Sequence, residues 1–389
     1  MIYLIPLLFI IFSIVCYDIA NYKRHKKLIF ITIIFILWAI SALCYRIGID
    51  IANNYMPEFH TIKTLDNISY DYLFDTHNRQ FGWMLLLTLI KSITPSFTLF
   101  KAIHALIINF TFGYVIYKYF KLKFTALLCY YVFIYVTVNF EILRESLAAS
   151  FFLLSIPYFI KRKFFKYYLF ICISISFHMS AFILLLFPLS ILITKSRNLI
   201  LCILCICIAS LAFVSQTQQL FYNLIFIESL SEKAIHYFSS ETHGASSYSI
   251  GNLVNYILNI IAPILLILKV KENDKYINQF APYIIVYAII YTASTHISIF
   301  FRFNNYFNIF FIFAYIELFY SKLLLSKYSQ KQRNKILFMA IIVFCILKLN
   351  VIMKPINNIP GYYRYYPYSS IFDKERNVNR EKIFDYLAL

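Results

Sequence analysis

Four arginines and one histidine stand out because they interrupt or border long apolar runs. Arg144 lies in VTVNFEILRESLAASFFLL, and the others are Arg46, Arg79, His178 and Arg302. A charged side chain in the hydrocarbon of a membrane costs roughly 2.5–3.5 kcal/mol, so it normally faces a protein interior or a watery cavity. The planar, permanently charged guanidinium also suits bidentate binding of phosphate groups. These residues therefore predict a site that binds a strongly anionic group at the membrane.

Other side chains near these arginines could move a proton or hold one. His178 lies among three serines, where it would act as a base for a hydroxyl group or as a hydrogen-bond donor. A histidine among serines is also a common structural element. Asp50 and Glu145 are the other candidate bases, and either could instead orient an arginine. Arginines beside a leaving group would stabilise the negative charge that develops on it.

Glu141 and Arg144 belong to one spacing pattern. Glu141, Arg144, Glu145 and Ala148 follow the i, i+3, i+4, i+7 spacing that predicts a shared helical face. A Glu141–Arg144 pair on such a face could simply neutralise itself. The other three arginines at similar apolar edges favour the functional interpretation.

The composition indicates that these residues belong to a membrane protein. The 389 residues are 61% hydrophobic and 14% charged, with a mean hydropathy of +0.70, which excludes an ordinary soluble domain. At about 20 residues per crossing, we expect an all-α polytopic integral membrane protein with about 12 transmembrane helices. The first segment lacks a basic region before it and a small-residue cleavage site, so we expect a retained helix. The whole chain, 1–389, is predicted to be a single polytopic membrane domain.

The apolar runs place the predicted elements. The stretch 167–193 is too long for one ordinary helix and is expected to break near His178. Residues 81–93 form a short apolar segment followed by Pro95, which we predict to be re-entrant or interfacial. Larger outer loops are expected at 48–80 and 215–250, with an outward C-terminal tail at 353–389. Helices are expected at about 1–20, 28–47, 97–117, 123–140, 146–160, 198–214, 251–269, 276–298, 302–320 and 336–352.

The net charge of +18 does not indicate nucleic-acid binding. Short loops carry most of the basic excess, and their Lys and Arg residues predict a cytoplasmic location by the positive-inside rule. These loops are 21–27, 118–123, 161–166, 195–197, 269–275 and 322–335. The eight cysteines are mostly inside apolar runs and indicate neither a metal site nor disulfides. The sequence has no Gly-rich phosphate loop, which argues against an ATP-driven machine.

The outer loops mix aromatic, amide and acidic residues, which suits stacking on sugars and hydrogen bonding to them. Tyr55 in the first loop, and Asn305 and Tyr306 after Arg302, are the candidate sugar-binding residues. Aromatic anchors at the membrane interface are the alternative explanation for such a composition.

The sequence resembles the EpsG/Wzy-like family of polysaccharide polymerases in four stretches. These are YRIGIDIANNYMPEF (45–59), NRQFGWMLLLTLIKSI (78–93), NFEILRESLAASFFLLSIPYFIKRKFFKYYLFICISISFHMSAF (139–182) and FRFNNYFNIFF (301–311). Two departures bear on the chemistry. Gln80 stands where many relatives have an acidic residue, which argues against a catalytic carboxylate there. Glu145 stands where relatives often carry an amide, which argues against a family-wide role for it as a base.

The resemblance implies a polymerase of undecaprenyl-diphosphate-linked oligosaccharide repeats, needing neither a metal nor a nucleotide sugar nor another cofactor. It implies the bacterial inner membrane, with the active site facing the periplasm or exterior, and a product such as O-antigen or capsule. Arg144 and Arg302 would hold the diphosphates, supported by Arg46 and Arg79, while His178 or Asp50 would act on the acceptor. A chain-length regulator and a flippase are the implied protein partners. A glycan ligase and a lipid-linked oligosaccharide flippase are the alternative functions.

Overall fold

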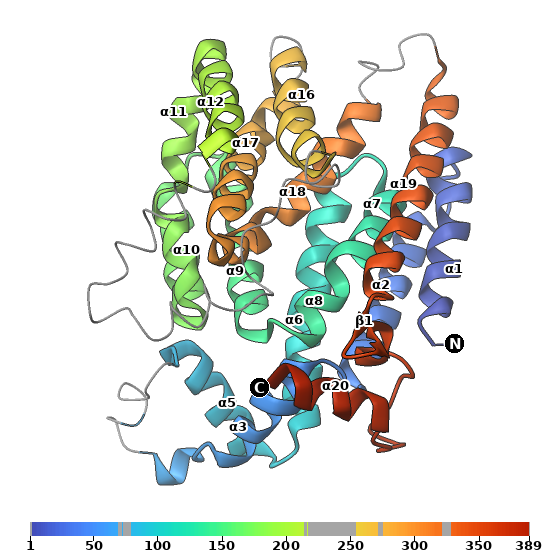
Figure 1. Ribbon diagram of the computed structural model, residues 1–389, viewed down its shortest axis with the longest axis vertical. Coiled ribbons are helices and arrows are strands. Elements are labelled where there is room, and N and C mark those ends of the chain that lie inside the picture. Colours follow the sequence, from blue (N-terminus) through green and yellow to red (C-terminus); the bar gives the residue numbers. More distant parts are fainter. Residues whose placement is uncertain are drawn as a thin grey trace. The chain divides into compact units, whose positions relative to one another are not determined.

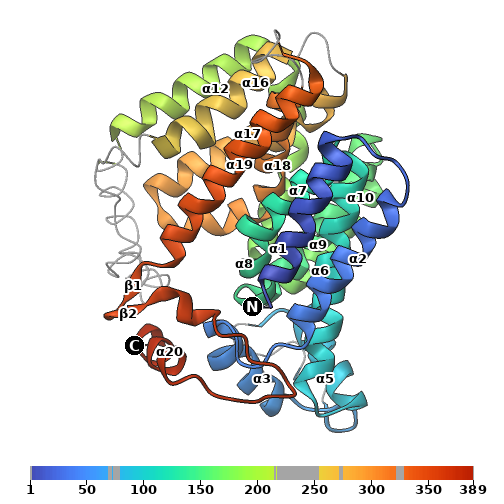
Figure 2. The same cartoon turned by 90° about the vertical axis from the view of Figure 1, so that its right-hand side faces the viewer.

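The computed structural model describes residues 2–68, 72, 79–213, 216, 254–270, 275–320 and 328–388. The chain forms two compact units. The first consists of Met1–Ala181 and Leu325–Leu389, and the second of Phe182–Leu324. Helices dominate both units, as Figures 1 and 2 show, which confirms the all-α prediction. The second predicted outer loop, 215–250, lies outside the described residues apart from Gln216.

The first unit contains the elements around most of the predicted site. A two-stranded antiparallel hairpin, β1 (Pro355–Ile356) with β2 (Ile359–Pro360), is the one sheet among the described residues. The helical elements of the first unit are α1 (Leu4–Ser13), η1 (Ile14–Ile19), α2 (Lys26–Ala42), η2 (Ile51–Tyr55), α3 (Met56–Thr61), η3 (Leu65–Asn67), α5 (Phe81–Ile93), α6 (Phe97–Tyr119), α7 (Lys123–Cys129), η4 (Tyr130–Tyr135), α8 (Val136–Phe140), α9 (Leu143–Ile160), α10 (Phe164–Phe177), α19 (Gln330–Ile352), η10 (Gly361–Arg364) and α20 (Val378–Ala388).

The second unit is built from helices alone in its described part. Aromatic rings pack its centre, where Tyr283 stacks on Phe310 with ring centroids 4.1 Å apart. After η5 (Met179–Leu185), its elements are η6 (Phe187–Leu189), α11 (Ser190–Lys195), α12 (Arg197–Ser210), η7 (Leu211–Phe213), η8 (Ile257–Ile261), α16 (Ala262–Val270), α17 (Lys275–His296), η9 (Ser298–Phe300) and α18 (Phe301–Tyr320).

Three helical stretches in the described residues are long and apolar enough to cross a membrane. They are α6, the continuous run Lys123–Phe140 made by α7, η4 and α8, and α9. A fourth is possible if Met179–Lys195 and Arg197–Ser210, which meet at 114°, count as one broken span. The sequence predicted about 12 crossings. Part of the difference is that some expected spans are shorter apolar helices here, among them Leu4–Ile19, and only the described residues enter this comparison.

The predicted break in 167–193 is present at the expected residue. α10 ends at Phe177, and His178 has an extended backbone with φ −152° and ψ 130°. The 3-10 segment η5 follows directly. The long apolar run is therefore divided where the histidine and its serines stand.

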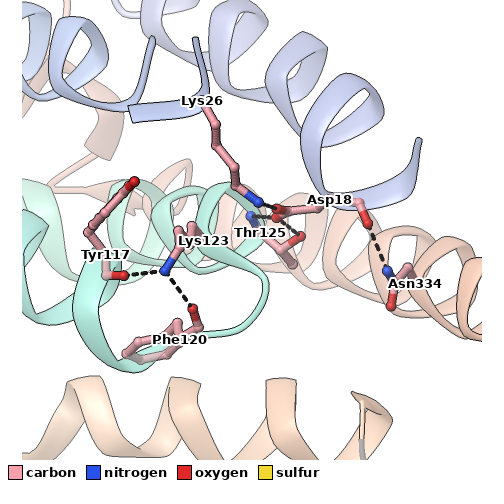
Figure 3. Close-up of polar contacts among 7 residues, drawn as sticks. All are labelled: Asp18, Lys26, Tyr117, Phe120, Lys123, Thr125 and Asn334. Atoms are coloured by element: carbon pink, nitrogen blue, oxygen red, sulfur yellow. Dashed lines mark hydrogen bonds and ion pairs between the residues drawn. The ribbon is translucent and has the colours of Figure 1, made fainter. Parts of the chain in front are cut away.

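One end of the first unit is fastened by Asp18 (Figure 3). Its Oδ2 accepts hydrogen bonds from the main-chain N–H and the hydroxyl of Thr125, at 2.8 and 3.0 Å. Its main-chain carbonyl accepts one from Asn334 at 2.7 Å, and Lys26 lies 3.6 Å from Oδ1. Asp18 thus satisfies a free N–H in the first turn of α7, as a capping carboxylate does. We call this the Asp18 end; it brings together η1 and the first turns of α2, α7 and α19.

The opposite end of the first unit carries the arginines. Since α2, α7–α8 and α19 begin at the Asp18 end, their last residues lie at the other end, and α6 and α9 begin there. α5 stays at this second end: Trp83 donates to Glu58 at 3.2 Å, and Ser92 accepts from the N–H of Leu65 at 2.9 Å. Beginning and ending at one end is the arrangement that a re-entrant or interfacial segment requires. Figures 1 and 2 show α3, α5 and α20 there, and we call it the arginine end.

The C-terminal segment, residues 355–388, folds onto the arginine end. Main-chain hydrogen bonds join Tyr45 to Ser369 at 2.8 Å and Ile371 to Leu43 at 3.0 Å. Apolar packing adds to them, because Ile383 and Phe384 of α20 bury themselves against Ala52 of η2. The expected outward tail is therefore an integral part of this unit and supplies side chains to it.

Candidate functional site

The site is organised around a break between α8 and α9. α8 ends at Phe140 and α9 begins at Leu143, so Glu141 lies between the two helices. The expected single face is therefore wrong for Glu141, whereas Arg144, Glu145 and Ala148 do lie on one helix, α9. The N–H of Leu143 donates to the carbonyl of Glu141 at 3.2 Å, not to that of Asn139, which accepts from Lys101 at 2.6 Å.

Lys101 and His104 of α6 hold this break in place. Both are fully buried, and they stand one turn apart in an apolar span. Nε2 of His104 lies 3.0 Å from the carbonyl of Leu143 and 3.0 Å from Oγ of Ser146. A lysine at a helix C-terminus is favourable, because it meets the negative end of the helix dipole. Sequence reasoning missed this pair, although a lysine and a histidine inside the run FTLFKAIHALIINF were a visible signal.

Gly48 brings the first outer loop against the same break. Its φ is +92°, and an added Cβ would lie 2.1 Å from the carbonyl oxygen of Phe140. Only glycine permits this backbone conformation together with so close an approach. The consequence is that Asp50, two residues later, reaches Glu141 electrostatically and through its own main chain.

Arg144 lies in the first turn of α9, beside Tyr55. The buried Tyr55 hydroxyl interacts with both the side chain and the main chain of Arg144. Burial raises the pKa of Tyr55 to about 12, with the nearby Asp50 charge acting in the same direction and Arg144 opposing it. A cation is unfavourable in the first turn of a helix, where the dipole favours anions. Arg144 therefore needs negative partners there, and Asp50, which acts on the same Tyr55, is one candidate.

Glu141 connects the C-terminal segment to the group formed by Asp50, Tyr55 and Arg144. Its Oε1 accepts from Nη2 of Arg364 at 2.8 Å and from the hydroxyl of Tyr365 at 2.7 Å. Burial raises the pKa of Glu141, while Arg364 and Tyr365 act to lower it and Asp50 raises it further. Asp50 also interacts electrostatically with Arg364. Sequence reasoning missed Arg364, which lies in the segment predicted only as an outward C-terminal tail.

Four arginines of this end, Arg46, Arg79, Arg144 and Arg364, differ in how Nε is used. Nε of Arg46 donates to Glu381 at 3.1 Å, with Nη2 bonded to the other carboxylate oxygen at 2.6 Å. Nε of Arg79 donates to Glu58 at 2.7 Å. In the described part of the chain, by contrast, the buried Nε atoms of Arg144 and Arg364 have no hydrogen-bond partner. A buried N–H without an acceptor costs about 1–3 kcal/mol. Among these four arginines, Arg144 and Arg364 are therefore the two whose Nε–H could donate to a bound ligand.

His178 also lies at the arginine end. Gly82 of α5 packs so closely on Ser176 that an added Cβ would lie 2.3 Å from its hydroxyl, and His178 follows two residues later. The N–H of Ser180 donates to Nδ1 of His178 at 3.2 Å. Nδ1 also lies 2.6 Å from Oγ of Ser180. Since an amide can only donate, a neutral ring that accepts from Ser180 N–H at Nδ1 carries its proton on Nε2, where it can donate.

The remaining predicted residues lie on α9 and α18. Glu145 is buried on α9, next to Arg144. Arg302, Asn305 and Tyr306 belong to α18 of the second unit, where Tyr306 is buried and Asn308 donates to Asn305 at 3.3 Å. Among the residues that the structure describes, no three His, Cys, Asp or Glu side chains gather as metal ligands.

The arrangement can bind an anion and handle a hydroxyl group. Nε of Arg144 has no hydrogen-bond partner among the described residues, the Asp50 carboxylate acts on the same Tyr55, and His178 lies at the same end of the unit. In a comparison with family models, the EpsG family matches residues 27–370.

The chain belongs to the EpsG family.

This family comprises Wzy-like polysaccharide polymerases, so the chain is a multi-pass membrane protein of the polysaccharide-polymerase type. The EpsG match includes the α8–α9 break, Arg144, His178 and Arg364, and it ends before Glu381. No curated protein and no solved structure matches the chain.

Proposed function

We propose that this EpsG-family protein is a Wzy-type polymerase of undecaprenyl-diphosphate-linked oligosaccharide repeats. It transfers the growing glycan from its lipid diphosphate to a hydroxyl group of a new lipid-linked repeat. The reaction takes place at the outer face of the bacterial inner membrane and serves O-antigen or capsule synthesis. The observation that carries the proposal is the buried Nε of Arg144, which has no partner among the described residues and lies in a group with Tyr55 and Asp50.

The proposed step is a glycosyl transfer with a diphosphate leaving group. The acceptor hydroxyl gives its proton to Asp50, and its oxygen attacks the anomeric carbon of the donor sugar. The bond from that carbon to the diphosphate oxygen breaks, and undecaprenyl diphosphate leaves with the electron pair. Arg144 stabilises the charge that develops on the leaving oxygen, which is commonly the largest electrostatic contribution to such catalysis. His178 donates from Nε2 to a sugar or phosphate oxygen.

The remaining predicted residues keep supporting roles. Arg46 and Arg79, through Glu381 and Glu58, hold the first outer loop and α5 in place. Arg302 is proposed as a second ligand for diphosphate, with Tyr55, Asn305 and Tyr306 near the sugars. A flippase that delivers the repeats and a chain-length regulator are the proposed partners.

The test is the ladder of surface and lipid-linked glycan from cells with and without the gene. Polymerase activity predicts single repeats without higher rungs when the gene is deleted. Polymer that accumulates on the carrier lipid would indicate a ligase instead. Repeats trapped at the cytoplasmic face would indicate a flippase.

A further inference from the structure

The C-terminal segment does more than pack on the arginine end: it also supplies a charged side chain, Arg364, to the candidate site. Arg364 enters the group formed by Asp50, Glu141 and Tyr365, each of which interacts with it electrostatically. Its side chain is 27% exposed, so it is accessible from one side while Glu141 fixes its position from another. Through Asp50 this group is continuous with Tyr55 and Arg144, since Tyr55 interacts with both.

Arg364 and Arg144 share a property that Arg46, Arg79 and Arg380 of this end lack, since Nε of Arg380 donates to the carbonyl of Tyr363 at 3.1 Å. Arg46 and Arg79 each donate from Nε to a carboxylate, and Arg46 donates from both Nε and Nη2 to Glu381. Over the described ranges, Nε of Arg144 and Nε of Arg364 are buried without a hydrogen-bond partner. Arg364 does have Glu141, but that contact uses Nη2 alone. A group that accepts several hydrogen bonds at once, such as a phosphate, suits donors of this kind.

We propose that Arg364 is a substrate-binding residue, which together with Arg144 holds the anionic phosphate group of the lipid-linked substrate. The inference rests on the proposed function and names a residue that supplies its anion site. Glu141 positions Arg364, because it fixes Nη2 and leaves the remaining donors of the guanidinium to the substrate. Tyr365 supports the same carboxylate from the neighbouring position.

The experiment is direct binding of farnesyl diphosphate to the purified full-length protein in detergent, measured by calorimetry. Arg364→Lys keeps a positive charge facing Glu141 but has no Nε. A substrate-binding role predicts a Kd at least about tenfold higher for this variant, the loss of one good charge-assisted contact. Arg376→Lys makes the same change at an exposed arginine of the same segment and should bind as the wild type does.

The outcomes separate this inference from the function on which it rests. Equal binding by wild type and Arg364→Lys would overturn the role of Arg364 and leave the polymerase proposal standing. Absence of farnesyl diphosphate binding by the wild type would overturn the diphosphate site itself. Farnesol and farnesyl monophosphate, measured in parallel, distinguish binding of the phosphates from binding of the apolar tail.

A second comparison covers the case in which Arg364→Lys folds poorly. Glu141→Gln weakens the ion pair but retains the whole guanidinium, whereas Arg364→Gln removes the guanidinium. A substrate-binding Arg364 predicts tighter binding for Glu141→Gln than for Arg364→Gln. Equal or weaker binding by Glu141→Gln would mean that Arg364 acts only as the partner of Glu141, and the inference would be rejected.

Discussion

Arg364 donates a 2.8 Å hydrogen bond to Glu141, a residue 223 positions earlier in the chain. The pair connects the break between α8 and α9 with the C-terminal segment. Asp50 of the first outer loop reaches the same carboxylate, so three distant stretches of sequence meet at one side chain. Glu141 therefore connects the α8–α9 break, the C-terminal segment and the first outer loop.

Replacing Glu141 by glutamine should change how stability depends on pH. Burial raises the pKa of Glu141 above its usual 4.5, so the folded protein binds this proton more tightly than the unfolded chain does. The resulting contribution to stability is fully present below pH 4.5 and is lost as pH rises through the folded-state pKa. Relative to Glu141→Gln, the wild type should therefore gain unfolding temperature as pH falls through this window. Glu375→Gln, at an exposed position of the same segment, is the control; a parallel shift in both variants would contradict the assignment.

Removing the Arg144 guanidinium should abolish polymer formation without loss of protein. Loss of one donor that faces a developing negative charge lowers rates by about 10²–10³-fold. We expect Arg144→Ala to leave single repeats on the glycan gel, with a normal band on an immunoblot. Unchanged polymer length in this variant would remove Arg144 from the mechanism.

His178 should tolerate glutamine better than alanine. The side-chain amide of glutamine can place an N–H close to the position of Nε2, whereas alanine offers no donor. We expect His178→Gln to retain at least about tenfold more polymerisation than His178→Ala, in line with the worth of one hydrogen bond. The measurement is the amount of polymerised glycan at matched protein level. Equal loss in both variants would favour proton transfer by the ring instead.

Gly48→Ala should destabilise the protein, because the added Cβ would meet the carbonyl of Phe140 and the backbone is strained at φ +92°. The expected loss of unfolding free energy is about 1–3 kcal/mol. Gly113→Ala is the matched control, since its Cβ would meet the side chain of Ile34, with Cδ1 at 2.8 Å and Cγ1 at 3.0 Å, and no backbone atom at such a distance. Its effect should stay within about 1 kcal/mol, because alanine favours the helix. Thermal unfolding in detergent compares the two, and equal effects would refute the close approach as the cause.

The helices were largely predictable, because a long apolar run is a local feature of the sequence and indicates a buried helix by itself. The run 123–140 is one helical stretch in the structure, and the break at His178 follows from a run too long for one helix. The break at Glu141 was not predictable in the same way. It depends on Lys101 taking the carbonyl of Asn139 and on Gly48 approaching Phe140, and both of these residues come from elsewhere in the chain.

The site was predicted in part, for a related reason. Residue type identified Arg144, Asp50, Tyr55 and His178, and the structure places all four at the arginine end. It could not show that Arg46 and Arg79 already direct Nε to carboxylates, because Glu381 and Glu58 gave no sign of being their partners. Arg364 was overlooked although it, too, is an arginine on the predicted outer side.

The two partners of the Arg364–Glu141 contact are made at different times during translation, Glu141 long before Arg364. A ribosome that has produced the chain from α6 through η5 has made Lys101, Arg144 and His178, but not the guanidinium that neutralises Glu141. Until residue 364 emerges, that carboxylate stays without its cation, which favours its protonated form. The nascent chain therefore cannot complete this end early, and a premature stop before the segment would leave a full set of apolar helices around an uncompensated acid.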